Sequence, residues 1–423
     1  MTKQNSALPG SDDITRVELK NGITILCREN FSSPSVVLSG YLSGGSLFDP
    51  REKLGLADFT ANLLMRGTQK RDFQGVFDAL ESVGASFGFS GQTHSVGFGG
   101  RSLVEDLPLL LDVLSDSLRQ PIFPDEYIER MRAQYMTGFA LRAQDTRDMA
   151  EMVFDGMLYA GHPYSLSSDG HPETIAAITR DDLVAFHREK YGPRGMVVTV
   201  VGAVDASSAV AQIEQALGDW QNPAQAKNIV VADMLPLNER QQRHHEIAGK
   251  SQSDLMLGFL GPKRRDDDYF AASLGNSILG RFGLMGRIGD VVREKAGLAY
   301  YARSILSAGM GPGAWYVSAG VNPANLEKAI ELILQELDNF AQNGVTEEEL
   351  ADNKANYIGR LPLSLESNQG VASSLLNMER HQLGWDYLRN YADTVNAVTR
   401  DDVLTVAQKY IQPERVTIAT AGP

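Results

Sequence analysis

The stretch 279–304, LGRFGLMGRIGDVVREKAGLAYYARS, contains three successive sequence patterns. Glycines recur at every third position near its start, a spacing that lets backbone approach backbone or a ligand closely. Apolar residues at helical spacing then predict a helix that ends at Gly297, in the position after a helix that favours a positive φ. Alternation from Leu298 onward predicts a strand. The order of helix, glycine turn and strand places Arg293 on the helix and Tyr300 on the strand.

Arg293 and Tyr300 flank the glycine turn and are the first candidates for a binding role. A guanidinium and a phenol held on rigid elements around one turn could reach the same carbonyl oxygen. Spacing alone favours the plainer alternative of a surface arginine and a core tyrosine. Tyr301 follows on the opposite face of the strand, and we expect it in the core.

Length and charge narrow the class of protein. A chain of 423 residues is too long for one core, so two domains of about 200 residues each are expected. The net charge of -14 argues against a nucleic-acid partner, because phosphate contacts need a basic surface. No apolar run reaches the roughly 18 residues of a membrane helix. The polar start of the chain lacks the apolar core of a signal peptide. These features predict a cytoplasmic protein without membrane contact, or a periplasmic one if a signal peptide has been removed.

The clearest internal repeat lies at the end of each half of the chain. Residues 178–202 read ITRDDLVAFHREKYGPRGMVVTVVG, and residues 398–422 read VTRDDVLTVAQKYIQPERVTIATAG. In both segments the threonine is expected to cap a helix whose first turn contains two acids. A Lys-Tyr pair ends each helix, and a proline then precedes an apolar strand. The shared order predicts a duplicated α+β domain.

The other elements fit the same plan. A strand, an Asn-Gly turn and a second strand over 17–30 predict a hairpin at the start of the first half. The polar stretch 221–245 reads as a linker. We therefore expect two homologous domains, 1–220 and 246–423, each a mostly antiparallel sheet with helices packed on one face. Two like domains on a long link favour a clamshell with a binding cleft between them.

The motifs of several enzyme classes are missing. The seven histidines show neither H-x-x-E-H nor H-E-x-x-H spacing, which would place two zinc ligands on one helix face. No G-x-S-x-G nucleophile motif occurs, and the glycine run is neither a dinucleotide nor a phosphate-loop fingerprint. A self-contained hydrolase with an unrecognised site therefore has no support beyond the expected cleft.

Several segments together resemble the pitrilysin-type inverted-zincin metallopeptidases. These segments are NSILG at 276–280, REKAGLAY at 293–300, GHPYS at 161–165 and the duplicated half. The chain is most similar to the half-size bacterial branch, which resembles the subunits of the mitochondrial processing peptidase. The resemblance covers nearly the whole chain, and 293–300 is its most specific part.

The resemblance implies that this chain has lost its zinc site. The family's H-x-x-E-H motif would lie on the first long helix, where its key positions hold Asp58, Ala61 and Asn62. The third ligand, a glutamate on a later helix, would fall at Gly138 or Phe139. A zinc hydrolase needs these ligands and a base beside its water, so no metal is expected in this chain. Asp58 and Asn62 could still share a weak hard cation, or form an ordinary polar pair.

The resemblance also implies a role in a heterodimer. In two-subunit members one chain holds zinc, and the other holds an Arg/Tyr pair that Arg293 and Tyr300 match in identity and spacing. This chain would then be the non-catalytic half of a zinc peptidase that acts on unfolded peptides, with zinc held by an H-x-x-E-H partner. Tyr300 would donate to the scissile carbonyl as it becomes an oxyanion, and Arg293 would bind a neighbouring carbonyl. Gly280, Gly283 and Gly286 would line the cleft beside the peptide. The alternative is an assembly module, similar to the core proteins of respiratory complexes, with no peptidase role.

Overall fold

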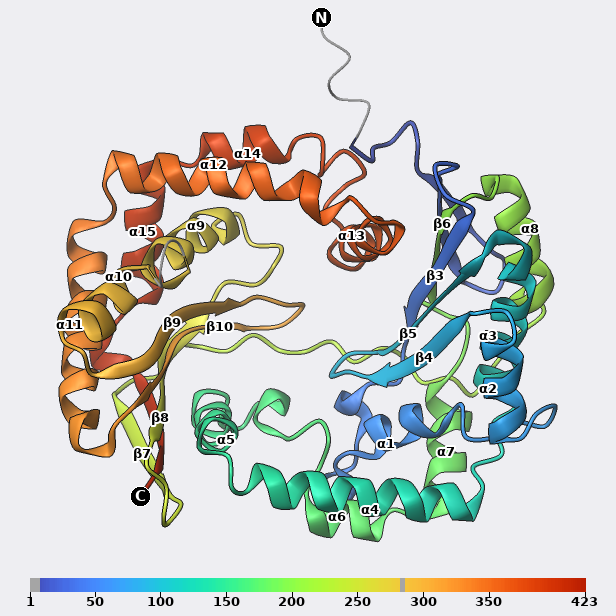
Figure 1. Ribbon diagram of the computed structural model, residues 1–423, viewed down its shortest axis with the longest axis horizontal. Helices are drawn as coiled ribbons and strands as arrows, with labels where there is room; N and C mark the ends of the chain where they lie inside the picture. Colours follow the sequence, from blue (N-terminus) through green and yellow to red (C-terminus); the bar gives the residue numbers. More distant parts are fainter. Residues whose placement is uncertain (1–7, 282–285) are drawn as a thin grey trace, which may run out of the picture. The chain divides into compact units, whose positions relative to one another are not determined.

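The computed structural model describes residues 8–281 and 286–423 (Figure 1). It confirms an α+β fold with two sheets, of six and five strands, each covered by helices. The chain divides into two compact units. Unit 1 is built from the chain up to Phe139, from 167–230 and from 362–389, and unit 2 from 140–166, 231–361 and 390–423. Among the described residues, no helix is long and apolar enough to cross a membrane.

The sheet of unit 1 has the strand order β1-β2-β6-β3-β5-β4. Its strands are β1 (Thr15–Glu18), β2 (Thr24–Glu29), β3 (Ser35–Leu42), β4 (Ser86–Gly91), β5 (Val96–Leu103) and β6 (Val197–Gly202). β1 and β2 form the predicted hairpin, and Gly22 takes a φ of 90° in its turn. Only the β2–β6 pair is parallel, so the sheet is mostly antiparallel as expected.

The sheet of unit 2 repeats this topology with the order β7-β11-β8-β10-β9. Its strands are β7 (Gln241–Glu246), β8 (Ser253–Gly261), β9 (Ala299–Ser307), β10 (Gly313–Val321) and β11 (Thr417–Gly422). Strand by strand this is the order β2-β6-β3-β5-β4, and again only the pair of first and last strands, β7 and β11, is parallel. The identical order confirms the duplication inferred from the sequence.

Helices cover one face of each sheet. In unit 1 the helices in contact with the sheet are α1 (Leu56–Leu63), α2 (Phe73–Glu81), α3 (Leu107–Arg119) and α8 (Ala206–Leu217), and the unit also holds the start of α4 (Asp125–Arg142), α6 (Pro172–Ala177) and α7 (Arg180–Lys190). In unit 2 the helices in contact with the sheet are α9 (Tyr269–Gly280), α10 (Gly286–Gly289), α11 (Leu326–Asn343) and α15 (Arg400–Tyr410), and the unit also holds most of α12 (Glu347–Ser364) and α14 (Tyr391–Ala397). The predicted caps of the repeat are confirmed, because Thr179 and Thr399 each form a capping box with the aspartate three residues on, at the starts of α7 and α15.

The other face of each sheet carries a helix from the other half of the sequence. α13 (Asn368–His381) packs on β3 and β6 of unit 1, and α5 (Thr146–Leu158) packs on β8 and β11 of unit 2. Alternation along β8 shows the two faces: Leu257 belongs to the core beneath α9 and α11, and Met256 to a second core with Phe154 of α5. Each compact unit is therefore built from several segments of the chain, whereas the predicted domains 1–220 and 246–423 are each contiguous.

Candidate functional site

The segment around Gly297 folds as helix, turn and strand, as the sequence predicts. The helical part is a π-helix, Asp290–Lys295, that continues from α10. Gly297 has a φ of 65°, and its N–H donates to the Arg293 carbonyl at 3.0 Å. The next N–H, of Leu298, donates to the Val292 carbonyl at 2.9 Å. π-Helices are rare and often occur at functional sites. Arg293 therefore lies in a segment with an unusual backbone conformation.

Tyr300 is the extra residue of a β-bulge at the start of β9. Ala299 pairs with Val321 of β10 and Tyr301 pairs with Gly320, so Tyr300 falls between the two pairs. A bulge re-aims a side chain out of the regular alternation of a strand. The Tyr300 side chain is 64% exposed, which rules out the plainer alternative of a core tyrosine.

Arg293 also reaches the surface. Its side chain is 41% exposed, and its Nε lies 3.7 Å from Oε1 of Glu294. Arg293 and Tyr300 are thus both accessible, on the two elements that Gly297 joins. Their contact with a peptide stays a prediction.

Tyr301 is not the core residue that alternation predicts; it is half-buried in a polar network. Its hydroxyl donates to Oδ1 of Asp254 at 2.6 Å and accepts from Nε of Arg147 at 3.1 Å. The Arg147 guanidinium lies 4.5 Å from the centre of the Tyr301 ring, and Asp254 is almost fully buried. Burial, and next the hydrogen bond to Asp254, raise the pKa of Tyr301. The network anchors β9 directly beside the bulge at Tyr300.

Close packing explains why glycine occupies two of the positions that were expected to face a peptide. Gly280 is buried at the end of α9, where an added Cβ would lie 1.9 Å from the backbone nitrogen of Ser304 on β9. Gly286 has a φ of 64°, and its Cβ would lie 2.5 Å from the nitrogen of Gly280. Gly283 lies outside the described residues. The glycines at 280 and 286 therefore let α9 and α10 approach each other and β9 closely, and a substrate contact stays a prediction.

The positions of the lost zinc motif lie together on α1. Asn62 Nδ2 donates to Oδ1 of Asp58 at 3.2 Å and to the Tyr135 hydroxyl, on α4, at 2.9 Å. That hydroxyl in turn donates to Oδ2 of Asp58. Ala61, at the position of the family's glutamate, is buried. The polar pair expected at Asp58 and Asn62 is thus a three-residue cluster.

Tyr135 is the residue that sequence reasoning missed. Counting from the motif placed the third position at Gly138 or Phe139, but Gly138 is exposed and Phe139 is buried in the apolar core. The apolar spacing of Ile128, Met131 and Phe139 marks the buried face of α4, and Tyr135 lies on that face. This spacing was the signal that could have identified Tyr135.

The cluster does not fit a zinc ion. Burial raises the pKa of Asp58, while the hydrogen bond from Tyr135 acts in the opposite direction. One carboxylate, one amide and one phenol, hydrogen-bonded to one another, lack the imidazole or thiolate ligands that zinc prefers. In the part of the chain that the structure describes, no group of three His, Cys, Asp or Glu residues is placed to hold a metal ion.

Replacing Tyr135 by phenylalanine is expected to destabilise the fold by about 1–3 kcal/mol, because Asp58 and Asn62 each lose a hydrogen-bond partner. Loss of the donor raises the folded-state pKa of Asp58 further, and stability from a raised pKa is lost as pH rises. The destabilisation should therefore be larger at pH 8 than at pH 5 in urea unfolding. An equal loss at both pH values would contradict the role of Tyr135 as a donor to an ionised carboxylate.

Two family models match the chain. The model described as "Insulinase (Peptidase family M16)" matches residues 24–160, and "Peptidase M16 inactive domain" matches residues 177–357. A Streptomyces coelicolor protein named as an uncharacterized zinc protease is 26% identical, over 98% of this chain and 90% of its own length. The mitochondrial-processing peptidase subunit beta of Saccharomyces cerevisiae is 23% identical, over 99% and 92%.

Solved structures show the same relationship. A crystal structure titled as the peptidase M16 inactive domain from Pseudomonas fluorescens has a TM-score of 0.88 at 28% identity, and the alignment covers 97% of this chain and 98% of that one. A protease from Helicobacter pylori has a TM-score of 0.90 at 19% identity, covering 98% and 100%, which shows a shared fold. The similarity extends over both units.

Proposed function

The chain belongs to peptidase family M16, and from this membership we propose that it is the non-catalytic half of a two-subunit zinc peptidase. In this proposal Arg293 and Tyr300 bind the peptide. A homologous partner with an H-x-x-E-H motif holds the zinc. The observation that carries the proposal is the contrast between a closed polar cluster at Asp58 and an exposed Tyr300.

The contrast matters because this chain lacks the family's zinc ligands on α1 but keeps the Arg/Tyr pair near β9. At α1 the side chains that would replace the zinc ligands satisfy one another, so nothing in the cluster activates a water. On β9 the bulge and the anchoring of Tyr301 keep Tyr300 in an exposed position. An exposed tyrosine on an anchored strand, beside an accessible arginine, favours a binding role over the assembly-module alternative.

The proposed chemistry of this chain is hydrogen bonding to a peptide. The Tyr300 hydroxyl donates to the scissile carbonyl oxygen, and the bond strengthens as that oxygen gains charge. The Arg293 guanidinium, with its fork of donors, binds a neighbouring carbonyl and fixes the register of the peptide. A zinc ion held by the H-x-x-E-H motif of the partner subunit would supply Lewis-acid chemistry for the same carbonyl.

Reconstitution tests the proposal. The purified chain alone is expected to cleave no unfolded peptide and to contain no stoichiometric zinc by elemental analysis. Mixing it with an H-x-x-E-H homologue from the same organism should produce cleavage that chelators abolish. One tightly bound zinc per isolated chain, or cleavage by the isolated chain, would end the proposal.

A further inference from the structure

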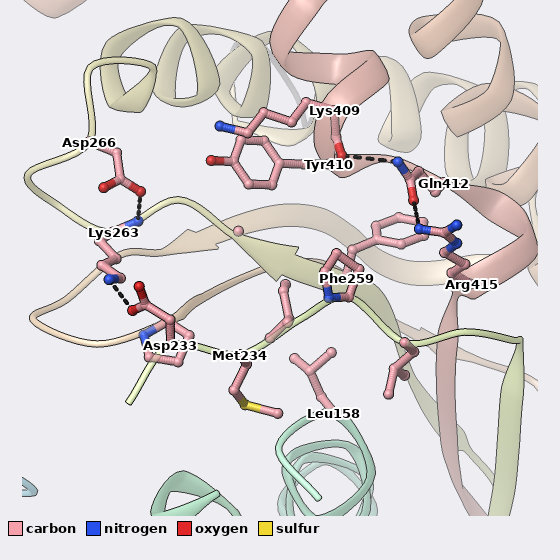
Figure 2. Close-up of a pocket in the computed structure, with 15 residues that line it drawn as sticks. Leu158, Asp233, Met234, Phe259, Lys263, Asp266, Lys409, Tyr410, Gln412 and Arg415 are labelled. Carbon is pink, nitrogen blue, oxygen red and sulfur yellow. Dashed lines mark hydrogen bonds and ion pairs between the residues drawn. The ribbon is translucent and has the colours of Figure 1, made fainter. Parts of the chain in front are cut away.

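Unit 2 contains a cavity of about 320 Å³ (Figure 2). It is formed by the end of β8, the end of α5, the end of α15 with the turn after it, and the segment 233–237 that precedes β7. Ligand pockets usually measure about 300–1,000 Å³, so the cavity suits a small ligand. Its lining includes neither Arg293 nor Tyr300, so the cavity is separate from the proposed peptide-binding residues.

One side of the cavity is apolar. Leu158 of α5 is almost fully buried in the core on the α5 face of β8, so its position is fixed by the packing around it. Met234, from the segment before β7, adds a second apolar side chain, and Figure 2 shows Leu158 and Met234 on the same side. Phe259 also lines the cavity, but it belongs to the core on the opposite face of β8, beneath α9 and α11. Such a wall favours a ligand with an apolar body.

Two of the three cations in the lining are neutralised by carboxylates. Lys263 forms an ion pair with Asp233. Lys409 Nζ lies 2.6 Å from Oδ2 of Asp268, which also accepts from the Tyr410 hydroxyl at 3.0 Å. A bound anion would have to displace a carboxylate to reach either lysine.

Arg415, the third cation, has a neutral partner at close range. Its Nη1 donates to Oε1 of Gln412 at 2.9 Å, while the Glu414 carboxylate lies farther away, at 3.9 Å from Nε. Gln412 is itself held by a hydrogen bond from its Nε2 to the Lys409 carbonyl at 3.2 Å. The amide of Gln412 thus orients the guanidinium at the cavity without cancelling its charge (Figure 2).

We propose that this cavity binds a small apolar carboxylate, such as an N-acylated apolar amino acid or the free carboxyl end of a peptide with an apolar last residue. The apolar body packs on Leu158 and Met234. The carboxylate binds the Arg415 guanidinium, whose parallel N–H donors match its two oxygens. The chemistry is the same for both sources, a free acid and a peptide end.

Calorimetric titration of the full chain with N-acetylphenylalanine tests the proposal. Saturable binding with a Kd on the order of 0.1–1 mM is expected for a ligand of this size. N-acetylphenylalanine amide should bind about 10-fold more weakly or worse, because it has no charge for Arg415. Acetate, which has no apolar body, should not saturate. A pentapeptide ending in phenylalanine distinguishes the sources, since it binds as well as N-acetylphenylalanine only if peptide ends enter the cavity.

Two pairs of variants locate the binding. Met234→Glu places an acid on the apolar wall and should abolish binding, whereas Leu235→Glu changes the next residue, which is 87% exposed and outside the lining. Arg415→Gln should weaken binding of the acid about 10-fold but leave binding of the amide unchanged. Arg265→Gln, at an exposed arginine outside the lining, should change neither.

Thermal unfolding of all four variants separates lost binding from lost folding. Absence of saturable binding to the wild-type chain would overturn the proposal. So would equal affinity for the acid and the amide, or undiminished binding to a folded Met234→Glu variant.

Discussion

Replacing Tyr300 by phenylalanine is expected to lower the kcat of the reconstituted two-subunit peptidase by about 10²–10³-fold. Phenylalanine keeps the ring but loses the hydroxyl that would donate to the carbonyl oxygen as its charge develops. KM should change little, because the lost bond is strongest in the transition state. Since Tyr300 is 64% exposed, folding and assembly should be unchanged. Steady-state cleavage of a quenched fluorescent peptide measures both constants.

Tyr316→Phe is the matched control for this experiment. Tyr316 lies on β10, the strand that pairs with β9, and its replacement removes the same hydroxyl group elsewhere on the sheet. Its rate should equal that of the wild type. A complex that assembles with Tyr300→Phe and cleaves at the wild-type rate would refute the proposed role of Tyr300 and favour the assembly-module alternative.

Replacing Gly280 by alanine is expected to destabilise unit 2 by about 3 kcal/mol or more. The new Cβ would lie 1.9 Å from the Ser304 nitrogen and 2.5 Å from the Ser304 Cβ, so α9 and β9 must separate. Overpacking a core usually costs about 1–3 kcal/mol, and backbone can yield less than a flexible side chain. Thermal unfolding followed by circular dichroism should show a lower midpoint.

Gly359→Ala provides the comparison for Gly280. Gly359 lies inside α12, and nothing lies within 4 Å of the Cβ that alanine would add. Alanine is favoured over glycine in a helix interior by about 1 kcal/mol, so this variant should be stabilised. If Gly280→Ala unfolded at the wild-type temperature, the close approach of α9 to Ser304 would be disproved.

The sequence predicted those features that depend on neighbours along the chain. The caps at Thr179 and Thr399 need only an aspartate three residues on, and the turn at Gly297 needs only a residue that tolerates a positive φ. The duplication was visible because both halves keep these local signals in the same order. Local chemistry of this kind survives in any tertiary context.

The features that the sequence did not predict depend on distant partners. The exposure of Tyr300 follows from a register shift against Gly320 and Val321, and no local signal marks a bulge there. The polar setting of Tyr301 comes from Arg147 and Asp254, which belong to other elements. Alternation predicts only on which face of a strand a side chain lies. It does not predict which residues from other elements pack against that face.

The exchange of α5 and α13 makes each half of the chain depend on the other for a complete fold. Each sheet is closed on its second face by a helix encoded in the opposite half of the gene. Neither half of the chain alone supplies the helix that covers the second face of its own sheet. Because the two halves are covalently joined, the exchange of these helices is a unimolecular event that does not depend on protein concentration. Two fragments produced by cleavage within 221–240 should accordingly stay associated in size-exclusion chromatography under native conditions.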